Sequence, residues 1–260
     1  MSNISSNAFI HPNAQIGKNV TIEPFAYIDD NTVIGDGTYI MSNANIRSGA
    51  RIGENCTVYP GAVVSGIPQD LKFHGEDSIA VIGNNTTVRE CVTISRGTDS
   101  KGKTIVGDNC LLMAYSHVAH DCILQNNIII GNATQLAGEV EIDDFAILSG
   151  GVLVHQFTRI GKHVMIQGGT RLGKDIPPYI IAGRDPVAYA GINLVGLRRR
   201  GFTNEQINQI QEIYRLIYQS GYNFSDATAK IEQELEKTAE SQLIVEFIKN
   251  SPRGIVRGYL

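Results

Sequence analysis

Three histidines, a glycine and a glutamine are the residues of this chain whose types and spacing could do chemistry together. They are His117, His120, Gly138, His155 and Gln156. The step from His120 to Gly138 equals the step from Gly138 to Gln156, so a chain that coils with this period would stack these three residues. His117 and His155 would then lie near the same corner. An imidazole base below a bare main-chain N–H suits attack by a substrate hydroxyl on an activated acyl group. No Ser or Cys occupies the facing positions, so we expect no covalent acyl-enzyme.

Two acidic residues flank this group. Asp121 directly follows His120, so in an extended chain its side chain points to the opposite face, and we expect it not to pair with His120. Glu139 directly follows Gly138 and adds a carboxylate beside the same column. That carboxylate could orient His120 or alter the contact with a substrate.

A six-residue repeat in the sequence indicates the fold that positions these side chains. Ile, Leu or Val recurs at nearly every sixth residue from Ile4 to Leu172, with lapses at Asp70, Glu76 and Ser100. The period fits a short strand, with one large and one small inward residue, followed by a tight corner. Three such units close a coil of about 18 residues, and successive coils stack about 4.8 Å apart. The sequence therefore predicts a parallel β-helix of hexapeptide repeats, mainly β in class.

The lapses and the end of the repeat divide the chain. Residues 65–79 and 95–104 leave the coil and return in the same phase, so we expect two excursion loops on a working face. We predict an acyltransferase-type β-helix domain over residues 1–185 and a C-terminal α-helical domain over residues 186–260.

Helical signals fill the C-terminal part. Thr203 and Gln206 have the spacing of a capping box that opens a helix, and Gly221 is placed to end it. We expect a second helix over residues 225–238, capped by its first residue, and a third over residues 242–250.

Composition excludes several classes of protein. The chain has 22 Lys and Arg against 26 Asp and Glu, a formal charge of −4, too few cations for a nucleic-acid-binding protein. The start lacks the pattern of a signal peptide and no apolar run is long enough for a transmembrane segment, so we expect a cytoplasmic protein. The cysteines form no CxxC pair, and Cys56, Cys110 and Cys122 fall on small-residue positions, which predicts core thiols.

Several longer motifs resemble the UDP-N-acetylglucosamine O-acyltransferases that begin lipid A biosynthesis. The resemblance runs essentially end to end and is carried by residues 69–72 (QDLK), 117–122 (HVAHDC), 155–157 (HQF) and 196–202 (GLRRRGF). It implies a left-handed β-helix and a cytoplasmic homotrimer. It also implies transfer of an R-3-hydroxyacyl chain from acyl carrier protein to the 3-hydroxyl of the UDP-sugar, with no cofactor beyond the carrier's phosphopantetheine and no metal.

The resemblance assigns roles to individual residues. His120 matches the general base and Gly138 the oxyanion donor. Gly168 matches the position that sets acyl-chain length, and its column of small side chains predicts a long acyl chain. The predicted substrate-binding residues are Gln69, Asp70, Lys72, His117, Glu139, His155, Gln156, Gly168, Asn193, Arg199 and Arg200. The cationic run at residues 198–200 would also suit an acidic carrier protein and a diphosphate.

Departures from the family pattern leave alternatives open. Glu139 and Ser95 stand where the family commonly has His, and Val195 stands where a Glu often meets the nucleotide. A 3-amino analogue of the UDP-sugar is therefore an alternative acceptor. A zinc site of the γ-carbonic anhydrase type is a further alternative, although the spacing of His117 and His120 on a strand does not suit joint ligation within one subunit. A third alternative is a solenoid without catalytic activity, but this interpretation does not explain why the three histidines lie together.

Overall fold

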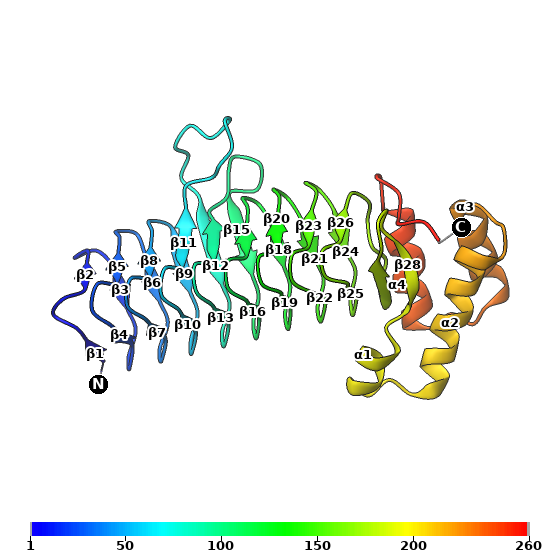
Figure 1. The fold of residues 1–260 in the computed structure, drawn as a ribbon, viewed down its shortest axis with the longest axis horizontal. Coiled ribbons are helices and arrows are strands. Elements are labelled where there is room, and N and C mark those ends of the chain that lie inside the picture. Colours follow the sequence, from blue (N-terminus) through cyan, green and yellow to red (C-terminus); the bar gives the residue numbers. More distant parts are fainter. Residues whose placement is uncertain (1, 259–260) are drawn as a thin grey trace.

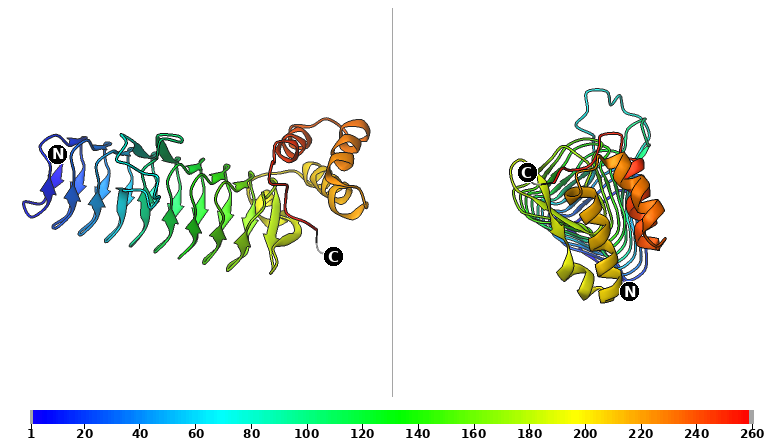
Figure 2. Two further views of the ribbon diagram at one scale, coloured as in Figure 1. Left: turned by 90° about the horizontal axis from the view of Figure 1, so that it is seen from above. Right: turned by 90° about the vertical axis from the view of Figure 1, so that its right-hand side faces the viewer.

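Stacked coils form a three-sided prism that helices close at the C-terminal end (Figures 1 and 2). The computed structural model describes residues 2–258, and Met1, Tyr259 and Leu260, which the predicted domains include, lie outside the described residues. The prediction of a left-handed β-helix of hexapeptide repeats is confirmed.

Each face of the prism is a sheet in which neighbouring coils pair in parallel. One sheet contains β1 (Asn3–Ile4), β4 (Thr21–Ile22), β7 (Tyr39–Ile40), β10 (Thr57–Val58), β13 (Thr87–Val88), β16 (Leu111–Leu112), β19 (Ile129–Ile130), β22 (Ile147–Leu148), β25 (Met165–Ile166), β27 (Ile180–Gly183) and the antiparallel β28 (Ala188–Ile192). The second contains β2 (Phe9–Ile10), β5 (Tyr27–Ile28), β8 (Asn45–Ile46), β11 (Val63–Gly66), β14 (Thr93–Ser95), β17 (His117–Val118), β20 (Gln135–Leu136), β23 (Leu153–Val154) and β26 (Arg171–Leu172). The third contains β3 (Gln15–Ile16), β6 (Val33–Ile34), β9 (Ala50–Ile52), β12 (Ile79–Ile82), β15 (Lys103–Val106), β18 (Ile123–Leu124), β21 (Glu141–Ile142) and β24 (Arg159–Ile160).

The six-residue period sets the register of the ladders from β1 to β26. In the second sheet Ile94 pairs with Val118, Val118 with Leu136, and Leu136 with Val154, and all of these side chains are buried. Each strand is too short to bury a core alone. Stacking the coils buries one aliphatic column along each face, and together these columns form the continuous core of the prism. Cys56, Cys110 and Cys122 lie in this core, as their positions predicted.

At the corners between the faces, the backbone adopts a conformation that few residue types favour. Residues in the left-handed region recur along the corners, and Asn occupies many of these positions, such as Asn31, Asn55 and Asn109. Asn tolerates this conformation better than most side chains do. Gly35 meets a different demand, since a Cβ there would lie 2.5 Å from the carbonyl carbon of Gly53 in the next coil.

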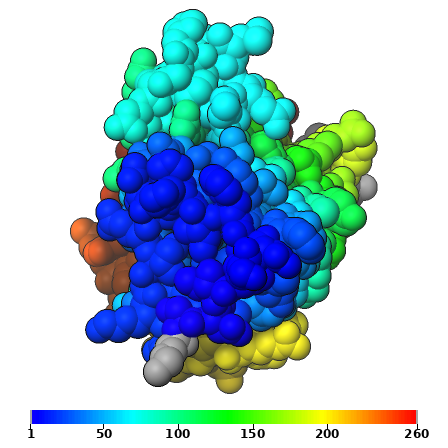
Figure 3. All heavy atoms as spheres, turned by 90° about the vertical axis from the view of Figure 1, so that its left-hand side faces the viewer, coloured from blue at the N-terminus to red at the C-terminus, as the bar shows by residue number. Residues whose placement is uncertain are grey.

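Two excursions leave the prism without shifting its register. The first connects β11 to β12 and stands out from the body of the molecule, in cyan in Figure 3. The second connects β14 to β15 beside it. Val64 still pairs with Ile94, and Ile82 with Val106, so the ladders continue across both excursions.

Helices cover the C-terminal end of the prism. They are α1 (Leu194–Arg199), α2 (Asn204–Gln219), α3 (Phe224–Glu234) and α4 (Ala239–Lys249). The Thr203–Gln206 capping box is present, but the predicted cap at Ser225 is wrong, since Asn223 caps α3. The predicted start of the last helix at residue 242 is also late, because Thr238 and Ser241 form a second capping box there. Within residues 2–258, no helix combines the length and apolarity that a membrane span requires.

Candidate active site

A cavity of about 1060 Å³ lies against the outer face of the second sheet, beside the first excursion. Predicted site residues that line it are Gln69, Asp70, Lys72, His117, His120, Gly138, His155 and Gln156. The remaining lining residues are Leu71, Ala119, Gln135, Leu136, Ala137, Leu153, Val154, Arg171, Leu172 and Gly173. Alanines and a glycine in the columns next to the imidazoles leave room for a ligand.

Gly138 lies directly above His120. A Cβ at Gly138 would be 2.6 Å from the His120 Nε2 atom, so any larger residue at this position would clash with the imidazole ring. The expected vertical stacking of these two residues is therefore present. The Gly138 N–H donates no hydrogen bond within the described part of the chain, and it is free to bind an oxygen beside the imidazole.

Asp121 holds the other edge of the His120 ring, contrary to the expectation that its side chain would point away. The His120 Nδ1 and Asp121 Oδ2 atoms are 2.8 Å apart, and Asp121 is fully buried. The prediction assumed an extended chain, but Asp121 is a corner residue with φ of 59°. The left-handed backbone breaks the alternation of faces, so adjacent side chains meet.

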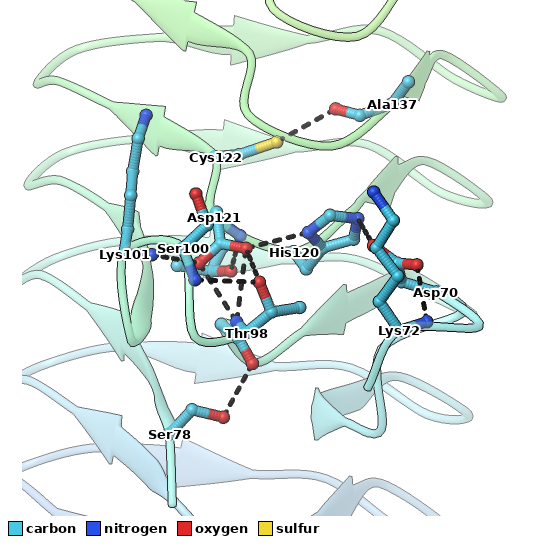
Figure 4. Close-up of polar contacts among 12 residues, drawn as sticks. Asp70, Lys72, Ser78, Thr98, Ser100, Lys101, His120, Asp121, Cys122 and Ala137 are labelled. Carbon is cyan, nitrogen blue, oxygen red and sulfur yellow. Dashed lines mark hydrogen bonds and ion pairs between the residues drawn. The ribbon is translucent and has the colours of Figure 1, made fainter. Parts of the chain in front are cut away.

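The second excursion surrounds the Asp121 carboxylate with hydrogen-bond donors (Figure 4). The Thr98 N–H lies 3.0 Å from Oδ1, the Thr98 hydroxyl 2.6 Å from Oδ2, and the Lys101 N–H 3.2 Å from Oδ1. All of these donate to the carboxylate, and so does the Nδ1–H of a neutral His120. With Nδ1 protonated, His120 Nε2 keeps its lone pair toward the cavity, as a general base requires.

The first excursion brings a second carboxylate to the same imidazole. Asp70 Oδ2 lies 3.6 Å from His120 Nε2, and Asp70 Oδ1 accepts a hydrogen bond from the Lys72 N–H at 2.9 Å. The ammonium group of Lys72 has no ion pair within residues 2–258. Arg96 supports this loop from the second excursion, with its guanidinium 5.2 Å from the centre of the Phe73 ring.

His117 lies on the cavity wall, where it pairs with Gln135 of the next coil. Its Nδ1 atom is 2.7 Å from the Thr93 hydroxyl oxygen. Burial lowers the pKa of His117, and the neighbouring His120 lowers it further. Both effects favour a neutral ring at this position, suited to hydrogen bonding rather than to ion pairing.

Comparison with known proteins identifies the family. A family model described as Udp N-acetylglucosamine O-acyltransferase, Domain 2, matches residues 175–256, and a bacterial transferase hexapeptide model matches residues 31–66 and 103–138. The acyl-[acyl-carrier-protein]–UDP-N-acetylglucosamine O-acyltransferase of Aquifex aeolicus (strain VF5) is 52% identical over 198 residues, which are 76% of this chain and 76% of that protein. The chain belongs to the UDP-N-acetylglucosamine O-acyltransferase family.

Further members of this family agree in sequence and in structure. The corresponding protein of Chlorobaculum parvum (strain DSM 263 / NCIMB 8327) is 48% identical over 195 residues, which are 75% of this chain and 74% of that protein. The crystal structure of a UDP-N-acetylglucosamine acyltransferase from Bacteroides fragilis 9343 matches with a TM-score of 0.96 and 61% identity, covering 97% of this chain and 99% of that one.

Other residues that the family resemblance predicted lie outside this cavity. Gly168 is exposed at the corner before β26, and Arg199 is exposed at the end of α1. Arg200 packs its guanidinium 5.2 Å from the centre of the Phe145 ring. Asn193 is buried, caps α1 through the Gly196 N–H, and donates to the His163 carbonyl oxygen at 2.9 Å.

Glu139 is also absent from the cavity wall, and its N–H donates to the His120 carbonyl oxygen at 3.0 Å. In the described residues, no cluster of three His, Cys, Asp or Glu side chains has the arrangement of a metal site. Sequence reasoning missed Asp121, Thr98 and Arg171. The unbroken phase around His120 gave no sign that a corner would turn Asp121 inward.

Proposed function

We propose that this chain transfers an R-3-hydroxyacyl group from acyl carrier protein to the 3-hydroxyl of UDP-N-acetylglucosamine, the first step of lipid A biosynthesis. The observation that carries the proposal is the pairing of His120 with buried Asp121, at 2.8 Å, beside the free N–H of Gly138. Relatives named as acyl-[acyl-carrier-protein]–UDP-N-acetylglucosamine O-acyltransferases support the choice of donor and acceptor.

The geometry supports direct attack without an acyl-enzyme. His120 Nε2 takes the proton of the sugar 3-hydroxyl while that oxygen attacks the thioester carbonyl carbon. Negative charge develops on the carbonyl oxygen, which the Gly138 N–H stabilises. When the intermediate collapses, the C–S bond breaks, and the proton on Nε2 passes to the departing thiolate. The products are the acylated sugar nucleotide and the free thiol of the carrier, and His120 is neutral again.

Each group has a defined share in this mechanism. Asp121 fixes the ring orientation and stabilises the imidazolium that forms, as the carboxylate does in a Ser-His-Asp triad. A general base contributes about 10²–10⁴-fold to the rate and one oxyanion donor about 10²–10³-fold. The donor carries its own phosphopantetheine, so the step as written balances without a further cofactor.

We also propose that the enzyme works as a homotrimer in the cytoplasm, where acyl carrier protein is found. Gly168, Asn193, Arg199 and Arg200 lie outside the cavity of one protomer, so a neighbouring subunit could bring them to it. The exposed side chains of Arg198 and Arg199 would suit an acidic carrier protein.

Mass spectrometry of the products tests this function. Purified protein is incubated with 3-hydroxyacyl carrier proteins of graded chain length and with UDP-N-acetylglucosamine or its 3-amino analogue. We expect one acyl group on the 3-oxygen, and a loss of about 10²–10⁴-fold in kcat for His120→Ala. His11→Ala, in an early coil far from the cavity, serves as the matched control. Acylation of the 3-amino sugar alone would contradict the O-acyl assignment, and chelator-sensitive activity with bound zinc would favour a metal enzyme.

A further inference from the structure

The chain returns from α4 to the prism and reaches the active-site cavity. Residues 251–256, here called the strap, cross the last coil, where the Asp175 N–H donates to the Gly254 carbonyl oxygen and the Val256 N–H to the Asp175 carbonyl oxygen. These bonds fix the strap beside Lys174, whose ammonium group binds the Arg253 carbonyl oxygen. The strap thereby places the Arg253 side chain next to His155, which lines the cavity.

Arg253 bonds two acceptors with one guanidinium. Its Nη1 atom lies 3.1 Å from the Gln156 carbonyl oxygen, and its Nη2 atom lies 3.1 Å from His155 Nδ1. A guanidinium has donors only, so His155 Nδ1 must accept and carries no proton in this arrangement. A neutral imidazole with an unprotonated Nδ1 carries its proton on Nε2. Nε2 is the nitrogen that remains for a ligand.

Without Arg253 the local geometry favours the other tautomer. His155 Nδ1 is also 3.0 Å from the Gln156 carbonyl oxygen, close enough to donate a hydrogen bond to it. Removing the guanidinium would free both atoms to form that bond, with the proton on Nδ1. Nε2 would then present a lone pair to the cavity instead of an N–H. Arg253 therefore selects which kind of ligand atom His155 can bind.

A second cation lies at the same end of the cavity. Arg171 on β26 pairs with Leu153 on β23, two residues before His155, and it also lines the cavity. Arg171 is exposed, and its guanidinium has no hydrogen bond or ion pair within the described residues. An unpaired guanidinium and an imidazole N–H on the wall of one cavity suit a phosphate, whose oxygens can accept from both.

We propose that this end of the cavity is a phosphate subsite, in which Arg171 and the His155 Nε2–H bind the ligand and Arg253 acts as a positioning residue behind His155. The proposal rests on the proposed function, which supplies two phosphate-bearing substrates. The phosphate belongs to the diphosphate of the sugar nucleotide or to the phosphodiester of the carrier's pantetheine arm, and separate KM values distinguish the two.

Steady-state kinetics on strap variants test the subsite. Arg253→Met keeps the aliphatic stem but removes the donors, and Arg253→Lys keeps the charge but not the paired donation. We expect both, and Arg171→Met, to raise the KM of one substrate about tenfold with kcat little changed. Arg257→Met is the control, because Arg257 lies on the same C-terminal segment with an exposed side chain away from the cavity. A higher KM for UDP-N-acetylglucosamine would show that the subsite binds the diphosphate. A higher KM for the acyl carrier protein would show that it binds the phosphodiester.

A double-mutant cycle tests whether Arg253 affects KM by positioning His155 or only by anchoring the strap to the prism. If Arg253 acts through His155, Arg253→Met has no further effect on KM in a His155→Ala background. An equal rise in both backgrounds, or unchanged KM values in folded Arg171 and Arg253 variants, would overturn the proposal.

The tautomer itself has a readout that needs no activity. In ¹⁵N-labelled protein, long-range ¹H–¹⁵N spectra show which His155 ring nitrogen is protonated. We expect the proton on Nε2 in the wild type and on Nδ1 in Arg253→Met. A wild-type spectrum with the proton on Nδ1 contradicts the role of Arg253. A wild type with no acyl transfer but the expected tautomer contradicts only the proposed function.

Discussion

At the scale of single residues, the corner backbone decides which groups can pair. The sequence repeat places Gly138 above His120 because that relation depends only on equal spacing along stacked coils. The contact between His120 and Asp121 depends on a local φ of 59° at Asp121, which the repeat does not encode. Counting along the columns therefore finds neighbours in different coils but not the contact between adjacent residues at a turn.

Replacing Asp121 by Asn tests the pairing with little change of shape. Asn tolerates the left-handed backbone at this position. Its oxygen would accept from the Thr98 N–H, leaving its NH₂ group to face His120 Nδ1. That contact favours a proton on Nε2, so the base loses its lone pair. We expect kcat to fall by about 10²–10⁴-fold with KM little changed, measured in steady-state assays.

Stability measurements on Asp121→Asn exclude a trivial cause. The melting temperature should stay within a few degrees of wild type, because most of the hydrogen bonds to residue 121 persist. A folded variant with wild-type kcat would show that His120 needs no carboxylate partner.

At the scale of the elements, each excursion loop supports the His120 imidazole from a different side. The second loop holds Asp121 through Thr98 and Lys101, and the first loop carries Asp70 to within 3.6 Å of His120 Nε2. The lapses in the repeat predict where these loops leave the coil. They do not predict which loop atoms contact the site, because irregular backbone has no period from which to read direction.

The corner column that ends at Gly168 gives a prediction about acyl-chain length. A Cβ at Gly168 would lie 3.2 Å from the Gly150 carbonyl oxygen and 3.8 Å from Ser149 Cβ, so a side chain fits with a small adjustment. We expect Gly168→Met to fill this corner and shift the preference to shorter acyl donors, because the longer chain loses its space. Competition between carrier proteins with long and short acyl groups, read by mass spectrometry, measures the shift. Unchanged selectivity would remove Gly168 as the length determinant.

The contact between the prism and the helical cap gives a prediction about pH. His163 stacks between Phe145 and Tyr179, with Phe202 against its edge, and its Nδ1 atom is buried without a partner. Burial first, and then the charges of Arg200 and Lys162, lower the pKa of His163 to about 4. In the unfolded chain a histidine titrates near pH 6.5, so below that pH the unfolded state binds the extra proton.

Stability should therefore be lost as the pH falls from about 6.5 toward about 4, by up to about 3 kcal/mol per chain from this group. His163→Phe keeps the aromatic stack and removes the titration. We expect the melting temperature of the wild type to drop more between pH 7 and about pH 5 than that of the variant. Equal drops would show that His163 is not the titrating group.

At the scale of the whole molecule, the predicted site is divided between regions that one protomer keeps apart. The repeat predicts the prism and its inner columns because each coil pairs only with its neighbours. It does not predict how the helices and strap meet the last coil, since those contacts join segments far apart in sequence. The hydrogen bond from Arg253 to His155 is one such contact, and no sequence pattern in the strap predicts it.

Mixed trimers test whether neighbouring subunits share the cleft. His120→Ala and Arg199→Ala chains with different affinity tags are co-expressed, and trimers that carry both tags are isolated. If His120 of one subunit works with Arg199 of the next, every such trimer has one cleft in which both residues are intact. We therefore expect about one-third of wild-type activity from two chains that are each inactive alone. Mixed trimers as inactive as their parents would show that His120 and Arg199 do not meet across a subunit boundary.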